Sequence, residues 1–69
     1  MKGLSGRELT KLLERNGWQR LRIQGSHHIY GRSDKDVRLS VPIHGNKTLK
    51  KGLQRHLLKL AGLPEADLP

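Results

Sequence analysis

Residues 25–30, with the sequence GSHHIY, hold the groups in this chain best suited to acid–base chemistry. They combine a turn-forming glycine and a serine hydroxyl with His27, His28 and Tyr30. Histidine has the unperturbed pKa closest to neutrality, so it can take or give a proton near pH 7. Adjacent histidines in a small protein are more often structural than catalytic. The segment therefore has to be judged by the elements that position it.

The charge of the chain favours an anionic partner. Fourteen Lys and Arg stand against six Asp and Glu, which gives a formal net charge of +8 over 69 residues. Basic residues recur in every predicted element rather than in one tail, a distribution typical of nucleic-acid binding through counterion release and electrostatic steering. Nucleic acid is the leading partner, and an acidic protein is the second.

Length and composition limit the class of protein. A chain of 69 residues suffices for one small domain, which buries only about 60% of the surface of its unfolded chain, so a large enclosed pocket is not expected. The absence of cysteine excludes a disulfide framework and a thiolate zinc site. No apolar run approaches the length of a membrane span. We expect one cytoplasmic domain over residues 1–69, with an ordered core from about 4 to 63, a frayed tail and no contact with a membrane.

The first helix is predicted from its two ends. Ser5 and Glu8 have the spacing of a capping box, in which hydroxyl and carboxylate each satisfy a free amide. Gly17 can adopt the left-handed conformation that ends a helix, and Trp18 then folds back as in a Schellman motif. Leucines at helical spacing define one buried face. Trp18 is therefore predicted to be a core residue.

A second helix is predicted from about Thr48 or Leu49 to Ala61. Leucines recur along it at helical spacing, and Gly62 is placed to end it. Between the two helices the apolar period changes to two, which predicts a three-stranded antiparallel meander. Pro42 marks the end of the third strand because it cannot donate to a ladder.

The register of the sheet is predicted from its first turn. A three-residue turn over 24–26 places Leu21 opposite Ile29, Arg22 opposite His28 and Arg20 opposite Tyr30. It also gathers the apolar side chains on one face. In the same register Tyr30 and His28 oppose Arg38 and Ser40 of the third strand. The apolar face then carries Leu21, Ile23, Ile29, Val37, Leu39 and Val41. The open face carries Arg20, Arg22, His28, Tyr30, Arg38 and Ser40.

This arrangement gives the two adjacent histidines different roles. Consecutive strand residues point to opposite faces, so His28 lies on the open face and is the candidate for chemistry, whereas His27 is predicted to pack. Both helices must cover the apolar face. The result is a two-layer α+β domain with the order α-β-β-β-α, which is the order of the double-stranded-RNA-binding fold.

Several ordered motifs resemble the HicA family of toxins. These motifs are Gly25-Ser26-His27-His28-x-Tyr30, Val41-Pro42-x-His44, Leu49-Lys50-Lys51-Gly52 and Leu57-Leu58-Lys59-x-Ala61-Gly62-Leu63. The resemblance implies the toxin of a type II toxin–antitoxin system. It also implies a ribosome-independent mRNA interferase, held inactive by an acidic antitoxin of the HicB type. It places the catalytic histidine at His28.

The residues present can supply most of a metal-independent ribonuclease. Such an enzyme needs a base for the 2′-hydroxyl, cations for the charged phosphorane and an acid for the leaving oxygen. His28 is the predicted base, and Tyr30 is predicted to stack on a base of the RNA or bond its phosphate. The remaining predicted RNA contacts are Arg20, Arg22, Ser26 and Arg38. His27 and His44 are auxiliary candidates, the general acid is not identified, and neither a metal nor a cofactor is expected.

Three other functions are compatible with the same sequence. A non-catalytic RNA-binding module of the same fold keeps the charge but has no need of His28. A metal site could draw on His27, His28, His44 and His56, although adjacent strand residues diverge. An interaction domain for an acidic protein needs only the positive surface.

Overall fold

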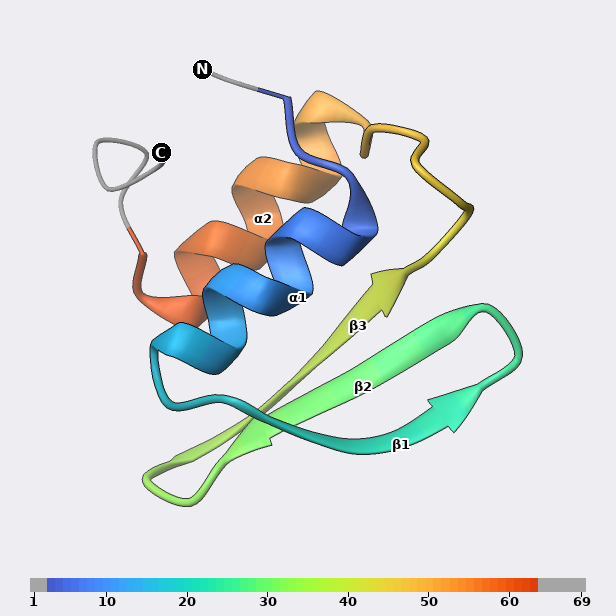
Figure 1. The fold of residues 1–69 in the computed structure, drawn as a ribbon. Helices are drawn as coiled ribbons and strands as arrows, with labels where there is room; N and C mark the ends of the chain where they lie inside the picture. The colour runs from blue at the N-terminus through green and yellow to red at the C-terminus, as the bar shows by residue number, and fades with distance from the viewer. Residues whose placement is uncertain (1–2, 64–69) are drawn as a thin grey trace.

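The computed structural model describes residues 3–63, which form two helices and a three-stranded sheet. The elements are α1 (Gly6–Arg15), β1 (Gln19–Gln24), β2 (His27–Arg32), β3 (Lys35–Pro42) and α2 (Lys51–Ala61). Both helices lie on one side of the sheet (Figure 1). The predicted two-layer α+β fold is confirmed, while the tail expected to fray lies outside the described residues. Neither helix is long and apolar enough to cross a membrane.

Helix α1 begins and ends as predicted. The Ser5 hydroxyl accepts a hydrogen bond from the Glu8 amide at 3.1 Å, and the Glu8 carboxylate accepts one from the Ser5 amide at 2.9 Å. Both amides would otherwise lack an intrahelical partner. At the other end Gly17 has a φ of +90°, and the Trp18 amide donates to the Leu13 carbonyl at 3.0 Å. This ending delivers Trp18 to the core, where it is 2% exposed.

Helix α2 begins at Lys51, later than the predicted start at Thr48 or Leu49. The cause is tertiary. Thr48 forms an isolated antiparallel bridge with Ser5, and the Leu49 amide donates to the Leu4 carbonyl at 2.7 Å. These contacts require extended backbone, so the helix starts only after them.

One core lies between the helices and the sheet. Its buried members are Leu4, Leu9, Leu13, Trp18, Tyr30, Leu39, Val41, Leu57, Leu58 and Ala61. The buried Gln54 side chain accepts a hydrogen bond from the Leu4 amide at 2.7 Å, which ties the segment before α1 to α2. Gly62 has a φ of +73° and the Leu63 amide donates to the Leu58 carbonyl at 2.9 Å, the predicted ending of α2.

The first hairpin differs from the predicted one at its turn. The turn is Gly25–Ser26, with two residues, and Ile23 rather than Arg22 pairs with His28. Gly25 has a φ of +57°, which suits the first position of a type II′ turn, whose twist matches that of the strands. The predicted three-residue turn is wrong.

A bulge at Leu21 compensates for the shorter turn. Arg20 pairs with Tyr30 and Arg22 pairs with Ile29, which leaves Leu21 without a partner. The predicted pairing of Arg20 with Tyr30 is therefore correct, although the turn that led to it is not. Between the bulge and the turn, every residue of β1 pairs one position away from the prediction.

The second hairpin is also displaced by one residue. Tyr30 pairs with Leu39 and His28 with Val41, each one position beyond the predicted partner. Because side chains alternate along a strand, a one-residue slip exchanges the two faces. His28 and Tyr30 consequently lie on the helix-covered face, and the predicted assignment of both to the open face is wrong.

Candidate functional site

His28 lies where the helix-covered face of β2 emerges from beneath the helices. Tyr30, two residues along the strand, is 1% exposed, whereas His28 is half-buried. Its neighbours across the sheet are Val41, which is fully buried, and Ile23, which is 52% exposed. The imidazole therefore stands at the boundary between the core and the solvent, where it can be held in place and still meet a ligand.

The imidazole of His28 forms no hydrogen bond or ion pair within residues 3–63. Neither ring nitrogen is therefore committed to a partner in that part of the chain. The backbone beside it is well fixed, because the Ile43 amide donates to the Ser26 carbonyl at 2.7 Å and joins the hairpin turn to the segment after β3. The arrangement provides a positioned histidine without a structural hydrogen bond.

Tyr30 belongs to the core rather than to a binding surface. Its hydroxyl donates to the Glu14 carboxylate at 2.6 Å and so connects β2 to α1. Burial, followed by this hydrogen bond, raises the pKa of Tyr30 from 10.0 to about 12. With the side chain 1% exposed, neither ring face is open to a nucleotide base. The predicted stacking role of Tyr30 is wrong.

Ser26 and His27 are both exposed at the turn of the β1–β2 hairpin. His27 neighbours His28 along β2 and so points to the opposite, uncovered face of the sheet. The predicted packing role of His27 is therefore wrong. The structure leaves both side chains available to solvent at the same end of the sheet as His28.

The arginines of β1 divide between the two faces. Arg20 pairs with Tyr30, and paired residues of antiparallel strands share a face, so Arg20 lies on the side of His28. Its charge acts on Tyr30 in the direction that lowers the tyrosine pKa, in agreement with this placement. Arg22 pairs with Ile29 on the uncovered face. Both arginines are exposed, as is every residue of β1, which is one of the two edge strands.

The uncovered face carries a pocket of about 230 Å³ towards the β2–β3 turn. Arg38 and Leu21 lie over Gly31 there: a Cβ built on Gly31 would stand 3.2 Å from Arg38 Cδ and 2.7 Å from Leu21 Cδ1. Arg38 thus occupies the open face, as predicted. Leu21 does not pack beneath the helices; it is 52% exposed.

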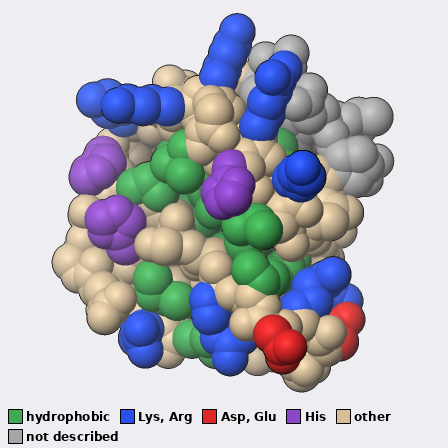
Figure 2. Space-filling model, turned by 180° about the vertical axis from the view of Figure 1, so that it is seen from behind, with side chains coloured by type: hydrophobic (Ala, Val, Ile, Leu, Met, Phe, Trp, Pro, Cys, Tyr) green, Lys and Arg blue, Asp and Glu red, His purple; other side chains and the backbone are tan. Residues whose placement is uncertain are grey.

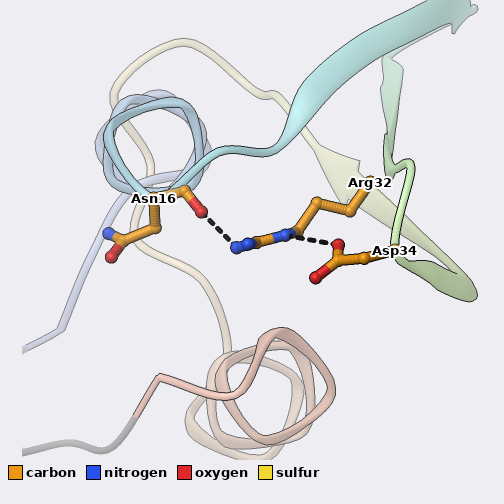
Figure 3. Close-up of polar contacts among 3 residues, drawn as sticks. All are labelled: Asn16, Arg32 and Asp34. Atoms are coloured by element: carbon orange, nitrogen blue, oxygen red, sulfur yellow. Dashed lines mark hydrogen bonds and ion pairs between the residues drawn. The ribbon is translucent and has the colours of Figure 1, made fainter.

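Arg32, at the far end of β2, is a structural cation. Its Nε donates to Asp34 Oδ1 at 2.8 Å, and its guanidinium also donates to the Asn16 carbonyl at 2.5 Å (Figure 3). The contact with Arg32 holds the pKa of the Asp34 carboxyl below its usual value of 3.8. Arg32 therefore fastens the β2–β3 turn to the end of α1.

Histidines and cations gather on the side of the molecule turned away from the view of Figure 1. Figure 2 shows Lys, Arg and His side chains around an apolar area, and the acidic side chains visible there lie together at one edge. His44 is exposed in the loop after β3. Among residues 3–63, no three His, Cys, Asp or Glu side chains could together hold a metal ion.

Two polar contacts that fasten β2 to α1 were not predicted from the sequence. Glu14, which fixes Tyr30, is an ordinary helix carboxylate in the sequence, and its role depends on tertiary structure. Arg32 stands next to a turn containing Asp34, a local pattern that could have indicated an ion pair.

The fold and the site define a small basic α-β-β-β-α domain with a half-buried histidine at the rim of its sheet. The family described as the HicA toxin of bacterial toxin–antitoxin systems matches residues 6–63. This match spans most of the chain, so the protein belongs to the HicA toxin family, and the suspected family is confirmed. Membership implies an antitoxin partner. No curated protein matches the chain.

Proposed function

We propose that this toxin is a ribosome-independent, metal-independent mRNA interferase of the cytoplasm in which His28 is the general base. The observation that supports the proposal is the placement of His28. It occupies the histidine position of the Gly-Ser-x-His motif, it is half-buried between Ile23 and Val41, and its ring has no partner within residues 3–63. A buried and hydrogen-bonded histidine would favour a structural role instead.

The reaction assigned to His28 is transesterification at a phosphodiester. The imidazole takes the proton of a 2′-hydroxyl, and the 2′-oxygen then attacks the adjacent phosphorus. The bond to the 5′-oxygen of the next nucleotide breaks, and that oxygen receives a proton. The products are a 2′,3′-cyclic phosphate and a 5′-hydroxyl. One positioned histidine contributes about 10²–10⁴-fold to the rate, so we expect slow turnover.

Exposed cations near His28 would stabilise the phosphorane. Arg20 is the candidate on the same face as His28, and it is exposed on β1, an edge strand. Arg22, Arg38 and Ser26 lie on the uncovered face or at the turn and would guide the RNA strand. With Tyr30 buried, the general acid is proposed to be His44 or a lysine, and His27 is proposed only as an auxiliary group.

The antitoxin partner is proposed to be an acidic protein of the HicB type that covers His28. A chain with a net charge of +8 attracts an acidic partner strongly. His28 stands at the rim of the sheet, so a bound protein can shield it. Carbethoxylation of His28 should accordingly be blocked in the complex. If His28 is modified at the same rate in the complex as in the free toxin, the antitoxin does not inhibit by covering this residue.

The test uses the chain freed of its antitoxin and a transcript of mixed sequence in the presence of a chelator. We expect wild type to leave 2′,3′-cyclic phosphate ends and His28→Ala to lose about 10²–10⁴-fold of the rate while it still binds RNA. His56→Ala is the matched control, since His56 is exposed on α2. A 2′-deoxy sugar at the mapped site should prevent cleavage.

The outcomes separate the proposal from its alternative. Cleavage by His28→Ala at the rate of wild type, with equal RNA affinity, contradicts the catalytic role of His28. RNA binding by wild type without any cleavage supports the non-catalytic RNA-binding module.

A further inference from the structure

A pocket of about 340 Å³ lies beyond the end of β3, against the start of α2. Its floor consists of half-buried apolar side chains, Pro42, Leu49 and Leu53. Small-molecule sites occupy about 300–1,000 Å³ and combine an apolar lining with a few polar groups. The size and the floor of this pocket suit one flat aromatic base.

The rim of the pocket is cationic. His44, Lys47 and Lys50 line it, and all three are exposed. None of these side chains is paired with an acidic group within residues 3–63. The first turn of α2 contains no acidic residue that would repel an anion. An apolar floor beneath three unpaired basic groups is complementary to a nucleotide, whose base is apolar on its faces and whose phosphate is anionic.

The pocket also lies close to His28. His28 pairs with Val41, and Pro42, the next residue of β3, forms part of the pocket wall. The side chains of His28 and Pro42 face opposite sides of the sheet, because consecutive strand residues alternate. Paired strands are roughly 5 Å apart, a separation that one nucleotide of an extended RNA strand can bridge. An RNA that presents a 2′-hydroxyl to His28 and passes around the end of β3 therefore brings its neighbouring nucleotide to this pocket.

We propose that the pocket formed by Pro42, His44, Lys47, Leu49, Lys50 and Leu53 binds the nucleotide that flanks the scissile linkage. The base rests on Pro42, Leu49 and Leu53, and the phosphate is held by the two lysines. This subsite rests on the proposed function, because it is a second point of attachment for the RNA that His28 would cleave. It makes the pocket a determinant of where the RNA is cut.

The direct test titrates the full chain with each of the four nucleoside 5′-monophosphates and follows the methyl NMR signals of Leu49 and Leu53. We expect these signals to shift and saturate, with weaker effects from the nucleosides and from inorganic phosphate. Lys47→Gln/Lys50→Gln should weaken nucleotide binding about tenfold, because it removes charge-assisted contacts to phosphate. Lys35→Gln/Lys59→Gln changes the net charge equally at exposed positions outside the pocket and should leave the affinity nearly unchanged.

A second measurement uses single-stranded RNA and the His28→Ala background, so that binding is measured without cleavage. Each lost phosphate contact reduces the salt slope by about 0.7 for a single strand. The pocket variant should therefore lower the slope by about 1.4, and the control variant by less. Equal effects of the two variants would overturn the subsite and indicate diffuse attraction. Methyl shifts produced by the antitoxin but by no nucleotide would overturn it as well, and assign the pocket to the protein interface.

Failure of the subsite and failure of the proposed function give different results. If cleavage depends on His28 but proceeds equally in the two lysine double variants, only the subsite proposal is contradicted. If the pocket binds nucleotides but the chain cleaves no RNA, the ribonuclease proposal is contradicted. The pocket then remains as a nucleotide-binding site.

Discussion

The two ends of strand β2 contrast in how their polar side chains are partnered. At the far end Tyr30 donates to Glu14 at 2.6 Å, and Arg32 donates to both the Asn16 carbonyl and Asp34. A phenol and a guanidinium are groups that commonly contact nucleic acids, yet here both are occupied by the fold. They fasten the sheet to α1.

At the hairpin end the polar side chains have no such partners among residues 3–63. His28 is half-buried and forms no hydrogen bond within the described residues, and His27 and Ser26 are exposed. The hairpin is held there by backbone, through the Ile43 amide and the Ser26 carbonyl. The comparison teaches that residue type alone does not separate function from support. The two roles are separated by whether the polar group already has a hydrogen-bond or ion-pair partner within the protein.

The strongest test of this contrast compares Tyr30→Ala with His28→Ala. Loss of the buried Tyr30 ring should reduce the free energy of unfolding by about 3–5 kcal/mol, as for other large aromatic truncations. His28→Ala removes a side chain that forms no hydrogen bond with residues 3–63, and it should change the free energy of unfolding by less than about 1 kcal/mol. Thermal or urea unfolding measures both. A loss for His28→Ala as large as for Tyr30→Ala would place His28 among the structural residues.

Two glycines test the same contrast through the backbone. A Cβ on Gly6 would stand 2.1 Å from the carbonyl oxygen of Pro42, which is main chain and cannot move aside. Gly6→Ala should therefore cost about 1–3 kcal/mol, as overpacking does, and should disturb the strand end beside His27. The denaturation midpoint of Gly6→Ala measures the loss of stability, and its RNA cleavage rate measures the effect on the site.

Gly31→Ala is the matched variant at the other end. The nearest atom to its Cβ is Leu21 Cδ1 at 2.7 Å, the tip of an exposed and flexible side chain. That side chain can rotate away, so Gly31→Ala should remain within about 0.5 kcal/mol of wild type. Equal costs for the two glycine variants would show that the approach of α1 to Pro42 is no tighter than the contact over Gly31.

How much of this could be predicted from the sequence depends on the kind of signal. The capping box at Ser5, the glycine endings and the apolar periods are local, and they predicted the order of elements and the core position of Trp18. The register was not predictable in the same way. It depends on a bulge at Leu21 and on a two-residue turn, and the assumption that all apolar strand residues share a face concealed both.

The candidate site shows the same limit. His28 was selected partly by a face argument that the structure contradicts, and only its position in the Gly-Ser-x-His motif is independent of that argument. Tyr30 was assigned to RNA because aromatic residues stack on bases, whereas its burial depends on α1 packing above it. The apolar pocket beside Lys47 and Lys50 requires β3 and α2 to meet, which no local pattern encodes.

A smaller effect is expected from Tyr30→Phe. The variant keeps the ring and loses only the hydrogen bond to Glu14, which should cost about 0.5–1.5 kcal/mol near neutral pH. The folded-state pKa of about 12 exceeds the unfolded value of 10.0, so ionisation favours unfolding. This contribution to stability is complete below about pH 10 and is lost as the pH rises through about 12. Thermal midpoints of wild type and Tyr30→Phe should converge over that range.

Tyr30 is the only tyrosine of the chain, so its ionisation can be followed directly by phenolate absorbance. Folded protein should titrate well above the urea-unfolded chain. Identical titration curves for the folded and unfolded chain would mean that Tyr30 is not buried against Glu14.

The smallest effect is expected at the Arg32 clamp. Arg32 holds the pKa of Asp34 below 3.8, and a carboxylate with a lowered folded-state pKa stabilises the fold above its unfolded pKa. That stabilisation is lost as the pH falls through the lower folded value. Asp34→Asn should therefore lower the thermal midpoint slightly at neutral pH, and the difference from wild type should shrink in acid. Because Asp34 is exposed, added salt should reduce the difference as well. RNA cleavage by Asp34→Asn should be unchanged, since the clamp lies at the end of β2 away from His28. If the variant lost cleavage activity at full stability, the far end of β2 would contribute to the reaction and not only to the fold.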